Sequence, residues 1–334
     1  MNVQRILFVN SLDADYLEDL TFAGLTEILG ADNVISYPTN HHYYYSKYQY
    51  PKNIGQCRPM FRYILDRLNI SNQLKRFEFD AIVLGSVKKD SCVSFLRLIE
   101  TMPKRIPLIF LDGGDRHEVG GDAIRENFVS LFNDVTRRVK FDIIFKRECL
   151  ISFQYESNVI PFPFSFKAPV YEMQKKKYDV VFWAVESDPI RSKALDLVRD
   201  RFDCTSNGTA AGQTFRHYRR KGKYFLEELS ASKIVYNFKG VGWDTLRYWE
   251  VPGVGSFMIS GEPKIQIPNN FQHGKHLVFC KDDLSDLLSL TEYYLRNEHE
   301  RVSIAKSGYQ HLQQHHTYRK RAEYFLDVLR SHKF

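Results

Sequence analysis

Short apolar runs alternate with amphipathic stretches along the first half of the chain. The runs are rich in branched and aromatic residues, as strands buried on both faces tend to be. Helical periodicity follows over residues 16–29, which stop at Gly30, and over residues 122–139. This alternation predicts an α/β fold in which helices wrap a parallel sheet. The expected strands are 5–10, 34–37, 81–85, 107–112 and 142–145.

A proline-rich segment, residues 159–171, interrupts the alternation. Three prolines within nine residues forbid a helix and favour an extended connector. Strand and helix patterns then restart, so we expect two Rossmann-like, doubly wound domains that face a central cleft. The predicted domains are 1–165 and 166–315, followed by a closing helix over 316–334 that packs back on the first domain.

Length and composition are those of a globular protein with two domains. The 334 residues are 43% hydrophobic and 26% charged, and no run of eighteen apolar residues occurs. The N-terminus leads directly into an expected strand without the pattern of a signal peptide, so we expect a cytoplasmic protein without a transmembrane segment. Its five cysteines stand singly and lack the paired spacing of a zinc or redox site.

The net charge of +7 belongs to the second half of the chain. Residues 1–165 carry 20 basic and 20 acidic side chains, whereas residues 166–334 carry 27 and 20. Such an excess fits a domain that binds phosphates, and it also fits attraction to nucleic acid or an anionic membrane. Part of it lies in the segment RHYRRKGK, residues 216–223, which solvated surface explains equally well.

The sequence GVGWDT places two glycines between an expected strand and an expected helix. Gly240 and Gly242 let the backbone approach a ligand, and the helix start beyond them offers N–H groups to an anion. We expect Asp244 to cap this helix, with Thr245 as its first residue. A nicotinamide-dependent oxidoreductase is an alternative, because Glu262 follows at a suitable distance, but the third glycine of that fingerprint is missing.

A second glycine pair, Gly253 and Gly255, follows the same expected helix. Glu250 falls in the last helical turn, where its carboxylate can accept hydrogen bonds from the hydroxyls of a ribose. Arg247, three residues earlier on the same face, supplies a fixed positive charge. Bare backbone beside this pair leaves room for a nucleotide diphosphate. A plain ion pair between Arg247 and Glu250 is the structural alternative.

The stretch from residue 240 to about 329 resembles the C-terminal domain of the CgeB-like glycosyltransferases, a group within the two-domain GT-B superfamily. The resemblance rests on the R-x-x-E of Arg247 and Glu250, on the small-residue turn after it, and on HTYRKR at 316–321. The first half resembles the group more loosely, through DADYLEDLTFAGLTEILG, FLDGGDRHE and FKRE. In the second half, the spacing of six further residues also matches the pattern of the group: Leu284, Tyr294, Leu295, Arg301, Ala305 and Gly308.

The resemblance implies that the second domain binds a nucleotide-sugar and the first binds most of the acceptor. Glu250 would then bind the hydroxyls of the ribose or of the donor sugar, Gly253 and Gly255 would lie near the diphosphate, and Arg191 would bind a phosphate. Related retaining families often carry a second Glu at the position of Gly242, so the resemblance leaves retention or inversion open. A UDP-sugar is the expected donor substrate, with no metal and no other cofactor.

Transfer of a sugar releases a nucleoside diphosphate, and without a metal its charge must be met by cations and helix N-termini. Arg191, Arg247 and Lys264 are the candidates in the second domain. Inversion also needs a base for the acceptor hydroxyl. The segment DGGDRHE, directly after an expected strand, offers three candidate bases, of which Asp115 is preferred. The alternative for its two aspartates, Asp112 and Asp115, is a role in shaping a turn. The three groups are Asp112, Asp115 and His117.

An aromatic segment, residues 39–51, follows the second expected strand and contains five tyrosines and two histidines. Tyrosine rings stack on sugars and bases, so this segment is a candidate acceptor site. A small packed cluster under a loop is the alternative interpretation. The candidate acceptor contacts are His42, Tyr43, Tyr44 and Tyr45.

The sequence thus predicts a metal-independent GT-B glycosyltransferase that uses a nucleotide-sugar and an unidentified acceptor hydroxyl, with closure of the two domains completing the site. The acceptor can be a glycan, a protein or a nucleic acid. One alternative is a phage-type enzyme that glycosylates modified DNA bases, and another is a non-catalytic protein that only binds nucleotide-sugars. The fold hosts many chemistries and does not decide between them.

Overall fold

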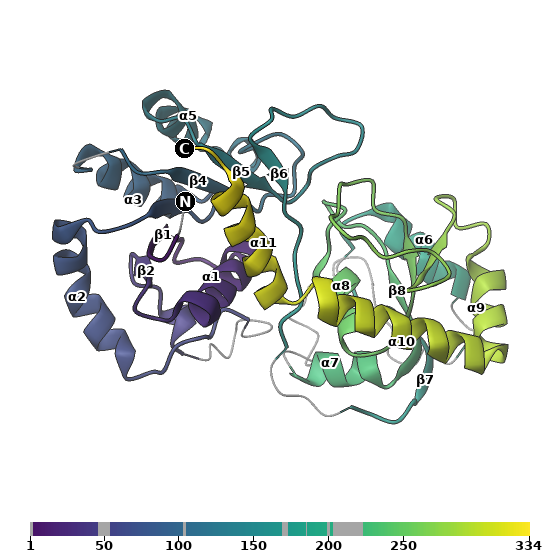
Figure 1. Cartoon of the computed structure of the whole chain (residues 1–334). Helices are drawn as coiled ribbons and strands as arrows, with labels where there is room; N and C mark the ends of the chain where they lie inside the picture. Colours follow the sequence, from purple (N-terminus) through teal and green to yellow (C-terminus); the bar gives the residue numbers. More distant parts are fainter. Residues whose placement is uncertain are drawn as a thin grey trace. The chain divides into compact units, whose positions relative to one another are not determined.

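The computed structural model describes residues 3–45, 54–102, 105–168, 173–184, 186–198, 201–202 and 223–334. The chain divides into two compact units (Figure 1). Unit 1 comprises Met1–Phe164 together with Tyr318–Phe334, and unit 2 comprises Ser165–Thr317. Each unit contains one parallel sheet with helices around it, which confirms the α/β architecture predicted from the alternation of apolar runs.

The sheet of unit 1 has six parallel strands in the order β2-β1-β3-β4-β5-β6. Ile6 of β1 pairs with Val34 of β2 on one side and with Ala81 of β3 on the other. The chain therefore changes direction across the sheet between β1 and β3, the place where ligands of such folds bind at the carboxyl ends of the strands. The strands are β1 (Ile6–Val9), β2 (Val34–Tyr37), β3 (Ala81–Leu84), β4 (Leu108–Asp112), β5 (Ile143–Lys146) and β6 (Val159–Pro161).

The helices of unit 1 include two where the periodicity over 122–139 predicts one. Asn127 has a φ of +58°, which ends the first helical segment, and a second one starts two residues later. The expectation of one continuous helix is therefore wrong. The helices are α1 (Tyr16–Leu29), α2 (Arg62–Arg76), α3 (Lys89–Glu100), α4 (Asp122–Arg125), α5 (Val129–Arg138) and α11 (Tyr318–Ser331).

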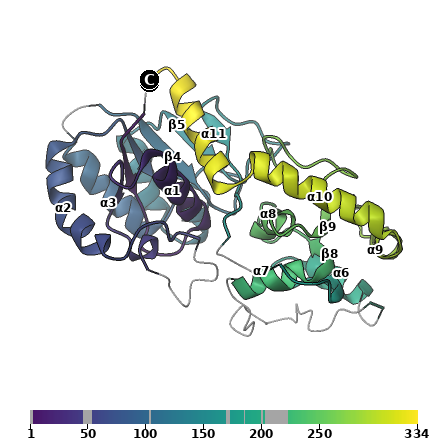
Figure 2. The same cartoon turned by 60° about the horizontal axis from the view of Figure 1, so that its bottom comes forward.

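The C-terminal helix α11 lies beside α1 in unit 1, although almost three hundred residues separate them in the chain (Figures 1 and 2). Small residues allow this close approach. A Cβ atom on Gly24 would lie 2.5 Å from the Tyr318 carbonyl oxygen and 2.7 Å from the Ala322 Cβ. A larger residue at position 24 would push the two helices apart.

The sheet of unit 2 has four parallel strands in the order β10-β9-β8-β7. Val180, Ile234 and Ile259 pack into the buried core of this unit. Its strands are β7 (Tyr178–Val181), β8 (Ser232–Asn237), β9 (Phe257–Gly261) and β10 (Val278–Cys280). Its helices are α6 (Pro189–Val198), α7 (Lys223–Ser230), α8 (Leu246–Gly253), α9 (Leu287–Arg296) and α10 (Glu298–His315).

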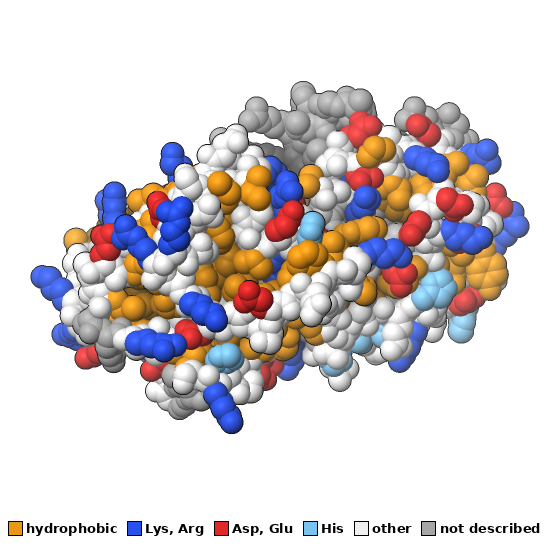
Figure 3. Space-filling model, turned by 90° about the horizontal axis from the view of Figure 1, so that it is seen from above, with side chains coloured by type: hydrophobic (Ala, Val, Ile, Leu, Met, Phe, Trp, Pro, Cys, Tyr) orange, Lys and Arg blue, Asp and Glu red, His pale blue; other side chains and the backbone are white. Residues whose placement is uncertain are grey.

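The surface carries charges of both signs among apolar side chains on the face drawn in Figure 3. Within the described ranges, none of the helices is long and apolar enough to cross a bilayer. Four of the cysteines, Cys57, Cys92, Cys149 and Cys280, are free thiols. Cys204 and nearly all of the basic segment 216–223 lie outside the described residues.

Candidate functional site

The first predicted donor residue of unit 2, Arg191 of α6, has its guanidinium group at the carboxyl end of β8. Its Nε donates to the Lys239 carbonyl oxygen at 2.7 Å, and its Nη2 donates to the Phe238 carbonyl oxygen at 3.1 Å. The side chain is buried, and burial lowers the pKa of Arg191 to about 10. The guanidinium therefore stays charged at neutral pH and is fixed at the end of β8.

A second buried guanidinium, that of Arg247 in α8, is fixed at the end of β7. Its Nη2 donates a hydrogen bond to the Trp183 carbonyl oxygen, and its Cζ lies 5.1 Å from the centre of the Phe182 ring. Two of the three predicted phosphate ligands of unit 2, Arg191 and Arg247, are thus anchored on main-chain carbonyls at the carboxyl edge of its sheet. Two fixed positive charges at such an edge can hold a diphosphate.

The start of α8 differs from the predicted cap. Thr245, not Asp244, is the N-cap residue, and its hydroxyl donates to the Asn237 Oδ1 at 2.7 Å instead of accepting from a helix N–H. The Asp244 Oδ1 accepts from the Trp249 Nε1 at 2.8 Å. The expectation that Asp244 caps the helix is wrong, because its carboxylate binds the indole inside the helix.

The first glycine turn packs against the guanidinium of Arg191. A Cβ atom on Gly240 would lie 2.9 Å from the Arg191 Nη2 and 3.0 Å from the Ser187 Oγ. The Gly240 N–H donates to the carbonyl oxygen of Gly242 at 2.9 Å, which makes the turn tight. Bare backbone at position 240 therefore leaves room for the arginine that the sequence assigns to phosphate binding.

The second glycine pair has a structural explanation. A Cβ atom on Gly253 would meet the Phe166 ring at 2.7 Å, so the helix packs closely on that ring. Gly255 has a φ of +70° and donates to the Pro252 carbonyl oxygen, while Ser256 donates to that of Val251. These bonds form a left-handed cap that ends α8. Neither glycine needs a diphosphate to account for its presence.

The remaining donor candidates of unit 2 are a buried acid and an exposed lysine. Glu250 lies in the last turn of α8, as predicted, and its side chain is buried. Lys264 follows β9 and is 42% exposed, with its Nζ 3.1 Å from the Glu262 Oε2 and 3.7 Å from the Asp282 Oδ2. Lys264 is therefore an exposed cation with two acidic neighbours, unlike the two buried arginines.

Asp112, at the end of β4 in unit 1, is fully buried and shapes the loop after the strand. Its carboxylate lies 3.1 Å from the Lys146 Nζ, which is also fully buried. Its oxygens accept from the N–H groups of Gly114 at 3.2 Å and Gly120 at 2.8 Å. These bonds give Asp112 the turn-shaping role that the sequence left as the alternative to catalysis.

Asp115, the preferred base, is paired with two arginines. It accepts a hydrogen bond from the Arg147 Nη2 and one of 2.8 Å from the Arg125 Nη1. Burial by itself would raise the pKa of Asp115, but Arg147 and Arg125 outweigh burial and lower it. A carboxylate with a lowered pKa is a weak proton acceptor, so Asp115 is better suited to holding the arginines in place.

His117 is the most exposed of the three predicted catalytic residues. Its side chain is 39% exposed, its Nδ1 lies 3.5 Å from the Glu118 Oε2, and its ring meets the Phe153 ring edge-on at 5.1 Å. It can therefore reach a molecule in solution without rearrangement of the core.

The predicted acceptor residues belong mainly to the interior of unit 1. His42, Tyr43 and Tyr44 are buried, and the Tyr43 ring stacks on the Phe22 ring with centroids 3.8 Å apart. The Tyr44 hydroxyl donates to the Asp66 Oδ2 at 2.7 Å, and the Tyr45 ring packs edge-on against the Tyr63 ring. The packed cluster therefore describes these side chains better than acceptor contact, and residues 46–53 of the segment lie outside the described residues.

A carboxyl group that the sequence does not single out, that of Asp15, lies at the switch point of the unit 1 sheet. Its Oδ1 accepts from the N–H groups of Leu17 at 3.1 Å and Glu18 at 3.2 Å, which caps α1. A Cβ atom on Gly113, at the end of β4, would lie 3.1 Å from the same oxygen. Asp15 is partly exposed and so reaches the carboxyl edge of the sheet.

The environment of Asp15 favours the protonated form more than water does. Burial raises the pKa of Asp15 above its ordinary value, while the Glu18 N–H, Lys88 and Arg147 act weakly in the opposite direction. A raised pKa makes this carboxylate a stronger base than Asp115. The signal in the sequence is an acid a few residues after the first strand, but a helix cap has the same signal.

Glu18 lies next to this carboxyl group and is fully buried. The Ser11 N–H lies 3.2 and 3.1 Å from its two carboxyl oxygens, and the Tyr43 hydroxyl donates to its Oε1 at 3.2 Å. Burial, followed by the charges of Asp15 and Asp19, raises the pKa of Glu18 well above its ordinary value. Among the described residues, these acids form no group of three or more that could hold a metal ion.

Known proteins share both the sequence pattern of the second half and the architecture of the chain. Residues 190–327 match the model of a family described as glycosyl transferase-like. A comparison with curated proteins found no match. The chain is similar in structure to Anabaena Alr3699/HepE in complex with UDP and glucose, with 12% sequence identity and a TM-score of 0.59, over 99% of this chain and 100% of that chain.

Two further solved structures have the same architecture. An alpha-glucosyltransferase in complex with UDP and a 13-mer DNA containing a HMU base is 10% identical, with a TM-score of 0.59 over 99% of this chain and 100% of that one. Sucrose-phosphate synthase from Thermosynechococcus elongatus is 11% identical, with a TM-score of 0.51 over 98% of each chain. The chain therefore has the GT-B fold.

Proposed function

We propose that this protein is a glycosyltransferase that moves a sugar from a UDP-sugar to an acceptor hydroxyl without a metal ion. The observation that carries the proposal is the pair of buried guanidinium groups, Arg191 and Arg247, fixed on main-chain carbonyls at the carboxyl edge of the unit 2 sheet. Both lie within the part of the chain that matches the glycosyl transferase-like family model. Two of the structural neighbours named above were solved with UDP.

The arginines would stabilise the charge that develops on the departing diphosphate. As the bond between the sugar and the diphosphate breaks, negative charge builds up on the phosphate oxygens, and fixed cations in a buried site stabilise that charge strongly. Because both guanidinium groups are held in place before the reaction, little reorganisation is needed. Glu250, in the last turn of α8, would accept hydrogen bonds from hydroxyls of the ribose or of the donor sugar.

Asp15 of unit 1 would accept the proton of the acceptor hydroxyl. The pKa of Asp15 is raised, so its proton affinity is higher than that of an acid such as Asp115, whose pKa is lowered by its arginine partners. In a direct displacement the acceptor oxygen forms a bond to the anomeric carbon, the diphosphate leaves, and the proton moves to Asp15. This assignment predicts inversion at the anomeric carbon. His117, the exposed candidate of the predicted set, is the alternative base.

Calorimetric titration with UDP, GDP and other nucleoside diphosphates tests the donor site. We expect UDP to bind, and Glu250→Ala to weaken that binding while the circular dichroism spectrum stays unchanged. If none of the nucleotides gives heat at millimolar concentration, the proposal is wrong. An affinity that Glu250→Ala leaves unchanged removes Glu250 from the donor site.

Release of UDP from a panel of UDP-sugars then tests catalysis and identifies the acceptor class. The panel of acceptors includes glycans, proteins and duplex DNA, because one structural neighbour was solved with DNA. UDP release that depends on one class of acceptor supports the transferase. Binding of UDP-sugars without release in the presence of any acceptor instead indicates a non-catalytic protein.

A further inference from the structure

Helix α2 of unit 1 carries an apolar stripe that faces solvent. None of its residues is buried, although a helix of fifteen residues beside a sheet normally buries an apolar stripe. Four large apolar side chains face solvent: Phe61, just before the helix, is 73% exposed, and Ile64, Leu65 and Leu68 are 64%, 53% and 70% exposed. With about 100° between successive residues, these four fall within an arc of about 100° and form one stripe. We call this stripe the outer face of α2.

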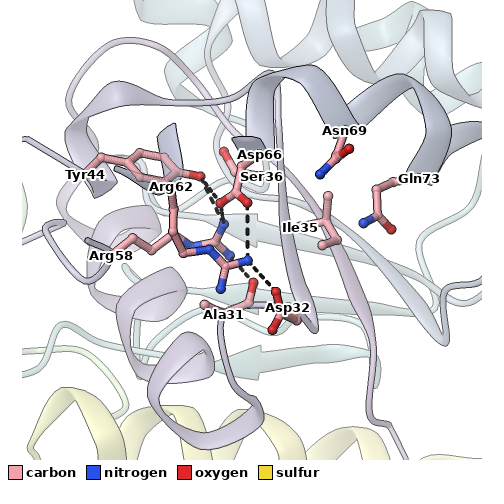
Figure 4. Close-up of a pocket in the computed structure, with 10 residues that line it drawn as sticks. All are labelled: Ala31, Asp32, Ile35, Ser36, Tyr44, Arg58, Arg62, Asp66, Asn69 and Gln73. Atoms are coloured by element: carbon pink, nitrogen blue, oxygen red, sulfur yellow. Dashed lines mark hydrogen bonds and ion pairs between the residues drawn. The ribbon is translucent and has the colours of Figure 1, made fainter. Parts of the chain in front are cut away.

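A polar side of α2 lines a cavity of about 70 Å³ against β2 (Figure 4). Arg62, Asp66, Asn69 and Gln73 point into it from α2, and Ile35 faces them from the strand. Arg62, Asp66 and Gln73 are only partly exposed there, whereas Asn69 remains exposed.

Ion pairs, together with Leu74, which packs on the core, and the Tyr63 ring, which packs on Tyr44, hold α2 to unit 1. Arg58 reaches across the cavity and donates from its Nη1 to the Asp66 Oδ2 at 2.8 Å, and its Nη2 donates to the carbonyl oxygen of Ala31 at 2.9 Å. Arg62 pairs with Asp32 and lies 3.4 Å from the Asp66 Oδ1. This network accounts for the position of α2 and leaves its apolar stripe without a role inside the unit.

An exposed stripe of this size is typical of a surface that binds another apolar phase or molecule. The charged residues around the stripe indicate which kind of partner it binds. Lys75 continues the outer face at the C-terminal end of the helix, Arg76 borders it, and Arg67 flanks it on the other side; all three are exposed. Asp66 is the single acid of the helix, and it turns toward Arg58 on the inner side.

We propose that the outer face of α2 docks on an anionic membrane surface. A helix with an apolar stripe and flanking Lys and Arg residues lies in the plane of a bilayer, with the apolar side chains among the acyl chains and the cations at the acidic headgroups. The charge pattern favours a lipid surface over a second copy of this chain, because two such helices would bring their cations together. Acceptors carried by lipids would then be concentrated where the enzyme binds.

Co-sedimentation of the full chain with vesicles tests this docking. We expect binding to vesicles of phosphatidylglycerol and phosphatidylcholine, weaker binding to phosphatidylcholine alone, and loss of the difference at high salt. The double substitution Ile64→Gln and Leu68→Gln should weaken binding about tenfold or more, because both side chains are exposed and would leave the acyl phase. Val302→Gln, at a 52% exposed position of α10 in unit 2, is the matched control and should bind as the wild type does.

Two further measurements separate membrane docking from misfolding of the variant and from self-association. Circular dichroism and UDP binding of the double variant should match those of the wild type, since the changes lie on an exposed face. Absence of wild-type binding to the acidic vesicles at low salt, or equal binding by the double variant, overturns the proposal. Light scattering that shows a dimer which the same double substitution dissociates would also overturn it and assign the face to self-association.

Discussion

The carboxyl edges of the two sheets differ in their charged groups: that of unit 2 carries two buried arginines, whereas that of unit 1 carries acids, two of which pair with the buried cations Lys146 and Arg147. In unit 2 the groups fixed at the strand ends are guanidinium groups, those of Arg191 and Arg247, and both donate to main-chain carbonyls. In unit 1 the comparable positions hold carboxyl groups, with Asp15 after β1 and Asp112 at the end of β4. Under the proposed function the edge of unit 2 would bind the diphosphate and Asp15 of unit 1 would accept the proton, the two tasks that glycosyl transfer requires.

The largest expected effect comes from removing the proposed base of unit 1. Asn at position 15 can still accept from the N–H groups of Leu17 and Glu18, so Asp15→Asn keeps the helix cap but cannot take up a proton. We expect kcat to fall by about 10² to 10⁴ with the melting temperature nearly unchanged. In the wild type, kcat/KM should fall toward acid, with an apparent pKa above the ordinary range of an aspartate, because Asp15 must be deprotonated to act.

Asp115→Asn is the matched control for this comparison within unit 1. Because its arginine partners lower the pKa of Asp115, we expect a smaller loss of kcat and a larger loss of stability. The reverse result, an inactive Asp115→Asn beside an active Asp15→Asn, would return the role of base to the residue preferred from the sequence. Loss of activity only in His117→Gln would assign it to the exposed histidine.

The anion-binding edge of unit 2 is tested by comparing ligands with and without phosphates. Arg191→Gln removes the positive charge but keeps a donor for the Lys239 carbonyl. We expect the affinity for UDP to fall by about 10- to 100-fold, the range for a lost hydrogen bond to a charged group, while the weak affinity for uridine stays the same. Calorimetry with both ligands measures the difference. An equal loss for UDP and uridine would mean that Arg191 only supports the fold.

The alternation of apolar runs predicted the α/β architecture because strands buried on both faces leave a local signal. Arg247 was proposed from the glycine turns around it and Arg191 from the family resemblance; the structure adds their main-chain partners and leaves their roles as proposals. The aromatic segment could not be interpreted in the same way. Whether Tyr43 faces solvent or the core depends on Phe22 and Glu18, which are far away in the sequence.

Two other features leave no distinct local signal. The pattern of α2 is amphipathic in either orientation, so nothing in the sequence indicates that its apolar stripe faces outward. Asp15 looks like any residue that caps a helix, and only its position beside Gly113 at the end of β4 and its raised pKa make it a candidate base. Long-range burial, which a local pattern does not contain, decides both cases.

Glu18 in unit 1 and His276 in unit 2 should contribute to stability with opposite dependence on pH. The pKa of Glu18 is raised on folding, so between its unfolded value near 4.5 and its higher folded value the folded protein holds a proton that the unfolded chain has lost. The contribution of Glu18 to the free energy of unfolding of unit 1 should therefore decrease as pH rises through that window. Glu18→Gln should flatten this slope, measured by hydrogen exchange of peptides from unit 1. An unchanged slope would show that Glu18 ionises normally.

The smallest expected effect is that of His276 in unit 2, whose contribution to stability depends on pH with the sign opposite to that of Glu18. Its ring stacks on that of His311 with centroids 4.1 Å apart, and burial, followed by the charges of His311 and Lys275, lowers the pKa of His276 to about 4. Below the unfolded pKa of 6.5 the unfolded chain binds a proton at His276 that the folded protein does not bind. The contribution of His276 to the stability of unit 2 should therefore decrease as pH falls from 6.5 toward 4. His276→Gln should reduce this loss in hydrogen exchange of unit 2 peptides and leave unit 1 unaffected. If His276→Gln instead changes hydrogen exchange in both units to the same extent, the effect of His276 on stability is not confined to unit 2.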